Sequence, residues 1–164
     1  MLEEVFSIYP LTWDAIACCM LSGLIIGLER QFLGKPVGVR TSMLVCVGTY
    51  VFLSISNSVT EDSGFTDPSR VIGQVVTGIG FLGAGVMLSR DGLVYGVTSA
   101  STIWGLAAIG VTIASGYEMT GVKIALLAVI ILVGVDLAED AWKFMQKGVH
   151  KKLKSKLKKP DTGE

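Results

Sequence analysis

The chain alternates long apolar blocks with short polar segments that contain nearly all of its charged residues. A bilayer core about 30 Å thick needs about 20 apolar helical residues to cross it, whereas a typical strand has about 5 to 6 residues. Blocks of this length therefore favour membrane helices over the buried strands of a parallel sheet. We predict an all-α, polytopic membrane bundle of five transmembrane helices. The blocks run from Thr12 to Leu28, Thr41 to Val59, Val71 to Leu88, Thr98 to Ala114 and Met119 to Leu137.

Composition agrees with this prediction, since 51% of the 164 residues are hydrophobic and the mean hydropathy is +0.60. The first positive residue is Arg30, after the first apolar block. A secretory signal peptide begins with basic residues, so this block is expected to stay as a permanent helix. Cysteines occur only within predicted spans, at Cys18, Cys19 and Cys46, where we expect small buried apolar side chains.

Positive charge is distributed unevenly between the two ends of the predicted bundle. With the N-terminus outside, 12 of the 14 lysines and arginines fall on inner segments, and only Arg70 and Lys123 on outer ones. An excess of positive charge marks cytoplasmic loops. The N-terminus is therefore predicted outside and the C-terminus in the cytoplasm.

The C-terminal tail differs in character from the spans, so we divide the chain into a transmembrane domain, residues 1–137, and a basic tail, residues 138–164. In the tail, Trp142, Met145, Val149 and Leu153 recur at spacings of three and four, which places them on one helical face. A basic amphipathic helix beside a membrane span is typical of a segment that lies on anionic lipid. A solvated lysine tail is the alternative, and no nucleic-acid binding is expected.

The stretch GIGFLG, residues 78–83, matches the G-x-G-x-x-G pattern of dinucleotide-binding loops. Such a loop follows a strand and needs an acidic residue about 20 positions later. Here Asp67 and Pro68 form a helix-start signal instead, and residues 98–102 contain no acid. We interpret the small residues as a seam that brings another helix close, with the fourth block as the expected partner. One seam comprises Gly73, Thr77, Gly80 and Ala84, a second seam beside it comprises Gly78 and Gly85, and Gly83 is a further expected packing residue.

Two sets of polar residues need an explanation. Asp67, Arg70 and Gln74 would form a polar strip at the outer end of the third helix, either as a capping cluster or as an entry point for a ligand or ion. At the inner helix ends, an interfacial charge network is geometrically possible, but the arginines, including Arg30, are rather expected to extend to the interface and anchor the bundle. The residues of that network would be Glu29, Arg30, Arg40, Arg90 and Asp91. The fourth helix is expected to be capped by Thr98 or by the serine that follows it.

Signals for catalysis are weak. His150 is the single histidine, so a His-based triad or a multi-histidine zinc site is not expected. No ionisable residue is predicted at the bilayer centre, where coupled pumps keep one. We predict a non-enzymatic protein without a cofactor, whose acidic outer rim could attract Mg²⁺ weakly, and the sequence leaves open whether a metal binds.

Four ordered blocks carry a family resemblance: GLER at 27–30, GKPVGVRT at 34–41, DPSRVIGQVVTGIGFLGAGV at 67–86 and GVTSASTIWGLAAIG at 96–110. They resemble the signature blocks of the MgtC/SapB family of bacterial inner-membrane proteins. Longer members of that family add a soluble C-terminal domain, so the chain is expected to be a short form without it. Matched position by position, the polar motif residues are Glu29, Arg30, Arg40, Asp67, Arg70, Gln74 and Thr98.

The resemblance implies a multi-pass protein of the inner (plasma) membrane, linked to magnesium homeostasis or adaptation to low magnesium and, in some pathogens, to virulence. It further implies a regulator of another membrane complex, such as ATP synthase, which we expect to act by helix–helix docking. Two alternatives stay open. One is a conduit for magnesium or another cation, and the other is a self-associating membrane scaffold, that is, a homo-oligomer.

Overall fold

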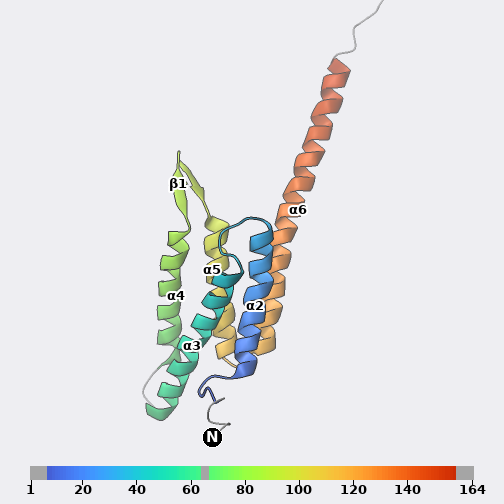
Figure 1. The fold of residues 1–164 in the computed structure, drawn as a ribbon. Helices are drawn as coiled ribbons and strands as arrows, with labels where there is room; N and C mark the ends of the chain where they lie inside the picture. The colour runs from blue at the N-terminus through green and yellow to red at the C-terminus, as the bar shows by residue number, and fades with distance from the viewer. Residues whose placement is uncertain (1–6, 64–66, 158–164) are drawn as a thin grey trace, which may run out of the picture. The chain divides into compact units, whose positions relative to one another are not determined.

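The computed structural model describes residues 7–63 and 67–157, and within them the chain is almost entirely helical (Figure 1). A short β-hairpin interrupts the helices, and the chain divides into two compact units, Met1–Val129 and Ile130–Glu164. The predicted helical class is confirmed, and the hairpin is an addition to it. The elements are α2 (Trp13–Phe32), α3 (Val39–Ser63), α4 (Pro68–Gly85), β1 (Leu88–Arg90), β2 (Leu93–Tyr95), α5 (Val97–Ala114) and α6 (Glu118–Leu157).

Four segments are long and apolar enough to cross a membrane: Trp13–Phe32, Val39–Val59, Val97–Ala114 and Glu118–Ala138. They correspond to four of the five predicted spans. Helix α4 is not among them, because five glycines, Arg70 and Gln74 dilute its apolar character. The fifth crossing and the orientation of the bundle stay predictions.

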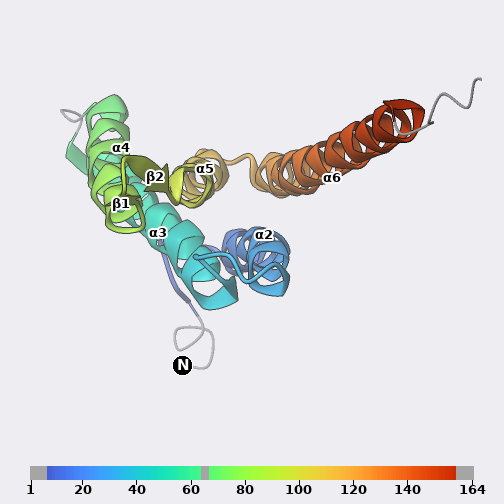
Figure 2. The ribbon, with the colours of Figure 1, turned by 90° about the horizontal axis from the view of Figure 1, so that it is seen from above.

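The core of the first unit lies where α2, α3 and α5 pack together, and α3 also contacts α4 (Figure 2). Ile26 of α2, Cys46 of α3 and Leu106 of α5 are all buried in this core, and Ala125 adds the beginning of α6. Cys19 is also buried and Cys18 is half-buried, as expected for small apolar residues.

Close packing of α2 on α3 depends on glycine. A Cβ atom added at Gly23 would lie 2.6 Å from the Cα of Met43, and one added at Gly27 would lie 2.5 Å from the Cα of Val39. On α5, a Cβ at Gly110 would lie 2.6 Å from the carbonyl oxygen of Cys46. Backbones this close are typical of membrane helices that associate through small residues.

The helix starts are capped in two different ways. Asp67 caps α4 by accepting a hydrogen bond from the Ser69 N–H at 2.9 Å, and Pro68 opens the helix, as predicted. The prediction for α5 is wrong, because its N-cap is Gly96 rather than Thr98 or Ser99. Gly96 has a φ of 88°, and an added Cβ would collide with the Val86 carbonyl oxygen. The chain leaves the hairpin through this tight left-handed residue, which glycine adopts without strain.

Helix α6 continues from Glu118 to Leu157, past the predicted domain boundary at residue 137. Trp142 is exposed on it. The side chains of residues 143–157, together with Lys158 and Lys159, lie outside the described residues. The predicted apolar face of the tail and its contact with anionic lipid therefore stay predictions.

Candidate functional site

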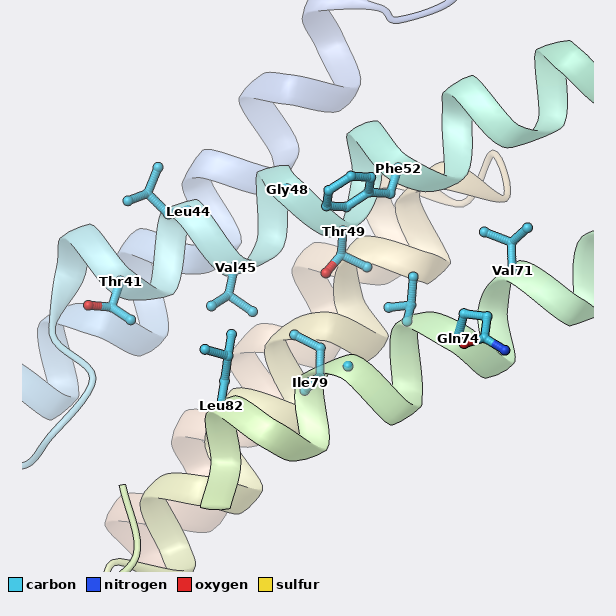
Figure 3. Close-up of a pocket in the computed structure, with 12 residues that line it drawn as sticks. Thr41, Leu44, Val45, Gly48, Thr49, Phe52, Val71, Gln74, Ile79 and Leu82 are labelled. Carbon is cyan, nitrogen blue, oxygen red and sulfur yellow. The ribbon is translucent and has the colours of Figure 1, made fainter. Parts of the chain in front are cut away.

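A groove of about 620 Å³ lies between α3 and α4 (Figure 3). Val45 of α3 and Leu82 of α4 point towards each other across it, and Gln74 lies beside Val71 towards one end. Most of the lining is apolar, and we call it the α3–α4 groove. Its residues are Thr41, Leu44, Val45, Gly48, Thr49 and Phe52 from α3, and Val71, Gln74, Val75, Gly78, Ile79 and Leu82 from α4.

The predicted glycine seam of α4 meets α5 at a single glycine. A Cβ added at Gly83 would lie 3.6 Å from the Cβ of Ala100, an ordinary contact. Around the other α4 glycines, no described atom outside the helix's own neighbourhood lies within 4 Å of an added Cβ. We call the side of the helix that carries Gly73, Thr77, Gly80 and Ala84, all of them exposed, the open face of α4. Gly78 and Gly85 are also exposed but lie on another side, and Gly78 lines the α3–α4 groove.

Thr77 does not break this open face, because its hydroxyl donates to the carbonyl oxygen of Gly73 on the same helix at 2.9 Å. In the part of the chain that the structure describes, the Thr77 side chain therefore makes no hydrogen bond to another helix. Whether another helix packs there stays a prediction.

The polar strip at the beginning of α4 is present, but its members do not close into a cluster. Hydrogen bonds from Ser69 lower the pKa of the Asp67 carboxyl, and the charge of Arg70 contributes less. Arg70 and Gln74 are both exposed. Within residues 7–63 and 67–157, the Gln74 amide makes no hydrogen bond, although the groove around it is apolar.

A second polar group joins the end of α2 to the beginning of α5. Nη2 of Arg30 donates to Oγ of Ser99 at 2.7 Å, and Nη1 lies 4.0 Å from Oε2 of Glu29. Arg30 is only 3% exposed, so the expectation that it extends to the interface is wrong. Ser99 and Glu29 offset part of the cost of burying this charge, while Nε of Arg30 is buried without a hydrogen bond to a described residue. We call Glu29, Arg30 and Ser99 the α2–α5 polar cluster.

The structure does not bring all seven motif residues together. Asp67 begins α4 and Ser99 follows the hairpin after its other end, and a helix of 18 residues is about 27 Å long. Arg40 and Thr98 are exposed and take no part in the cluster. The polar strip and the α2–α5 polar cluster are thus two separate sites.

Sequence reasoning chose Thr98 and missed Ser99 as the partner of Arg30. A signal was available, because Ser99 shares a helical face with Thr102, Ile103 and Leu106, all of them buried. The motif position next to it, Thr98, lies off that face. For metals, no group of three or more His, Cys, Asp or Glu side chains among the described residues could hold an ion.

Comparison with known proteins places these features in a family. The family described as "MgtC family" matches residues 16–141. The "Putative magnesium transporter YhiD" of Escherichia coli (strain K12) is 40% identical over 123 residues, which cover 72% of this chain and 55% of that protein. "Protein MgtC" of Salmonella typhimurium (strain 14028s / SGSC 2262) is 40% identical over 131 residues, covering 80% of this chain and 53% of that protein.

An "Uncharacterized protein" of Haemophilus influenzae is 38% identical over 140 residues, covering 81% of this chain and 56% of that protein. The chain spans about half the length of the curated relatives that it matches. No solved structure matches it. The family match covers most of the chain and, apart from residues 13–15, all four apolar helices. The chain is a multi-pass membrane protein and belongs to the MgtC family.

Proposed function

We propose that the chain is a non-enzymatic bacterial inner-membrane protein, linked to magnesium homeostasis, that regulates another membrane complex by binding one of its helices. The magnesium link is supported by the printed name of the Escherichia coli relative. The docking step is carried by one observation, the open face of α4 beside the α3–α4 groove.

A transmembrane helix is the occupant that fits this surface best. Lipid provides little hydrophobic drive between helices, so helices associate where small residues let their backbones approach closely. Gly73 and Gly80 offer such an approach because nothing described covers them. The Gln74 amide lies in the groove without a hydrogen bond to any described residue, and an acyl chain has no group that could pair with it. We infer an apolar helix of a partner protein with small residues and one hydrogen-bonding side chain opposite Gln74.

Photo-crosslinking in living bacteria tests this proposal. A photoreactive amino acid at Gly80 or at the exposed Val76 should form adducts that map to a transmembrane segment of another protein. Leu127 of α6 is 54% exposed, compared with 41% for Val76, and the same probe at Leu127 serves as the control. Gln74→Leu should weaken the Gly80 adduct about threefold to tenfold, as expected for a lost hydrogen bond of about 1 kcal/mol.

Two outcomes would contradict docking on another complex. Adducts confined to lipid would remove the protein partner. Adducts confined to a second copy of this chain would favour the self-associating scaffold. Gly80→Leu, which fills the open face, should in either of the protein-binding cases abolish the adduct formed at Val76.

A cation conduit is the second candidate, because the Escherichia coli relative carries the name of a transporter. Purified protein in liposomes would then pass Mg²⁺, and Asp67→Ala or Gln74→Ala would reduce the flux. A flux no greater than that of protein-free liposomes would favour the regulator. The mainly apolar lining of the α3–α4 groove supports the regulator as well, since a cation path needs oxygen ligands.

A further inference from the structure

A second cavity of about 290 Å³ lies where three segments of the first unit converge. Residues just before and within the first turn of α2, the second half of α3, and the turn from α5 into α6 form its walls. It shares no lining residue with the α3–α4 groove. We call it the three-segment cavity, and unlike the groove it has a mostly polar lining.

The charge on the described lining of this cavity is negative. Glu118 is the single charged residue among the described residues that line the cavity, and it stands in the first turn of α6. The dipole of a helix favours a negative charge at this end. Within residues 7–63 and 67–157, no lysine, arginine or histidine lines the cavity to neutralise it. The cavity therefore attracts a cation.

Three polar side chains of α3 in the lining make no hydrogen bond to a described residue. In the part of the chain that the structure describes, the side chains of Ser54, Asn57 and Ser58 make no hydrogen bond, although Ser54 is only 9% exposed. Polar groups removed from bulk water lose free energy unless a partner restores their hydrogen bonds. The lining thus offers two hydroxyl oxygens and one amide oxygen as acceptors in addition to the Glu118 carboxylate.

Aromatic residues complete the lining. Tyr9 and Tyr50 both line the cavity, and the Tyr50 hydroxyl is held by the Thr12 N–H at 2.9 Å. Aromatic faces attract organic cations, and the attraction increases when the cation is desolvated. A bare metal ion is less well served, because no group of three carboxylate, thiol or imidazole ligands occurs among the described residues.

We propose that the three-segment cavity binds a small organic cation with a primary ammonium group. The ammonium donates hydrogen bonds to the Glu118 carboxylate and to the serine hydroxyls, while its alkyl part lies against the tyrosines. This site is separate from the surface for helix docking at α4, so the inference goes beyond the proposed function. An experiment can contradict either proposal without affecting the other.

Isothermal titration of the full chain in nanodiscs tests the proposal, with n-butylammonium as the probe and 1-butanol as its neutral counterpart. The ammonium should bind and the alcohol should not. Glu118→Gln should weaken binding at least about tenfold, the value of one charged hydrogen bond. Asp14→Asn is the matched control, because Asp14 is an exposed carboxylate of the α2 first turn that does not line the cavity. It should change affinity less than about twofold.

Ser54→Ala and Ser58→Ala provide a second set of variants that leaves the charge of α6 intact. Each should weaken binding about twofold to tenfold, since each removes one neutral acceptor. Thermal unfolding of each variant reports whether it folds. Equal binding by 1-butanol, unchanged affinity in Glu118→Gln, or Glu118-dependent binding of Mg²⁺ with none of butylammonium would each overturn the proposal.

Discussion

Two sets of glycines at helical spacing behave in opposite ways in this protein. On α2, Gly23 and Gly27 lie so close to α3 that a single added carbon would overlap its backbone. On α4, Gly73 and Gly80 have no described atom beyond their own helix segment within 4 Å of an added Cβ. The same small-residue pattern therefore serves interior packing in one helix and leaves an uncovered face in the other.

The arginines of α2 and α4 differ in the same way as their glycines, since one is buried and the other is exposed. Arg30 at the end of α2 is buried and hydrogen-bonded to α5, whereas Arg70 in the first turn of α4 is exposed. Helices α2, α3 and α5 thus form a connected core, while one side of α4 remains free. Close packing supplies the stability of a helix bundle in a membrane, and the side of α4 that no described residue covers is where we propose that a partner docks.

The largest effect should come from the polar connection inside the core. Arg30→Ala removes the guanidinium from the Ser99 hydroxyl and from the neighbouring Glu29 carboxylate. Breaking a buried ion pair from one side costs about 3–5 kcal/mol. We expect that loss in the free energy of unfolding, measured in mixed micelles. Arg40→Ala, at an exposed arginine, should change it by less than about 0.5 kcal/mol.

The next largest effect should come from the α2–α3 contact. Gly27→Ala places a methyl group against the backbone at Val39, so the helices must separate. Inserting a carbon into a well-packed core costs about 1–3 kcal/mol. Gly105→Ala on α5 is the control, since nothing described lies within 4 Å of its added Cβ. Equal unfolding free energies for the two variants would contradict the close packing of α2 on α3.

On α4, replacing a glycine by alanine should stabilise the protein instead of destabilising it. Gly80→Ala adds a methyl group to open space, and alanine is a better helix former than glycine by about 1 kcal/mol. We expect unfolding of the isolated protein to become harder by up to that amount. A loss of stability comparable to that of Gly27→Ala would show that the face is covered after all, and would remove the surface on which docking is proposed.

Sequence patterns predicted the helices well because apolar length is a local property. The start of α4 at Asp67 and Pro68 followed from capping chemistry in the same way. The contacts of a helical face depend on parts of the chain that are distant in sequence. The small residues of α4 could therefore be recognised as a seam, but the sequence did not determine which segment packs on them. The equivalent spacing at Gly23 and Gly27, which does pack, was overlooked.

The β-hairpin was missed although the sequence contains its signal. Asp91 and Gly92 stand between two runs of three residues that pair in register, and both have positive φ values, 53° and 76°. An Asp-Gly pair of this kind is the preferred two-residue hairpin turn. Because the pair lies between two long apolar blocks, the segment was interpreted as a short connection without secondary structure. The hairpin also explains why Gly96, which follows its second strand, is the N-cap of α5.

The smallest effect should appear at the exposed first turn of α4. Because the Ser69 hydrogen bonds lower the pKa of Asp67 in the folded chain, its cap contributes fully above the unfolded value of about 3.9. That contribution is lost as the pH falls through the lower, folded pKa. Exchange of the Ser69 amide hydrogen should therefore gain protection as the pH rises out of that acidic range, beyond the intrinsic pH dependence of exchange. Asp67→Asn keeps a capping side chain without a titrating group, so its Ser69 protection should show no such step, and a step of equal size there would assign it to another group.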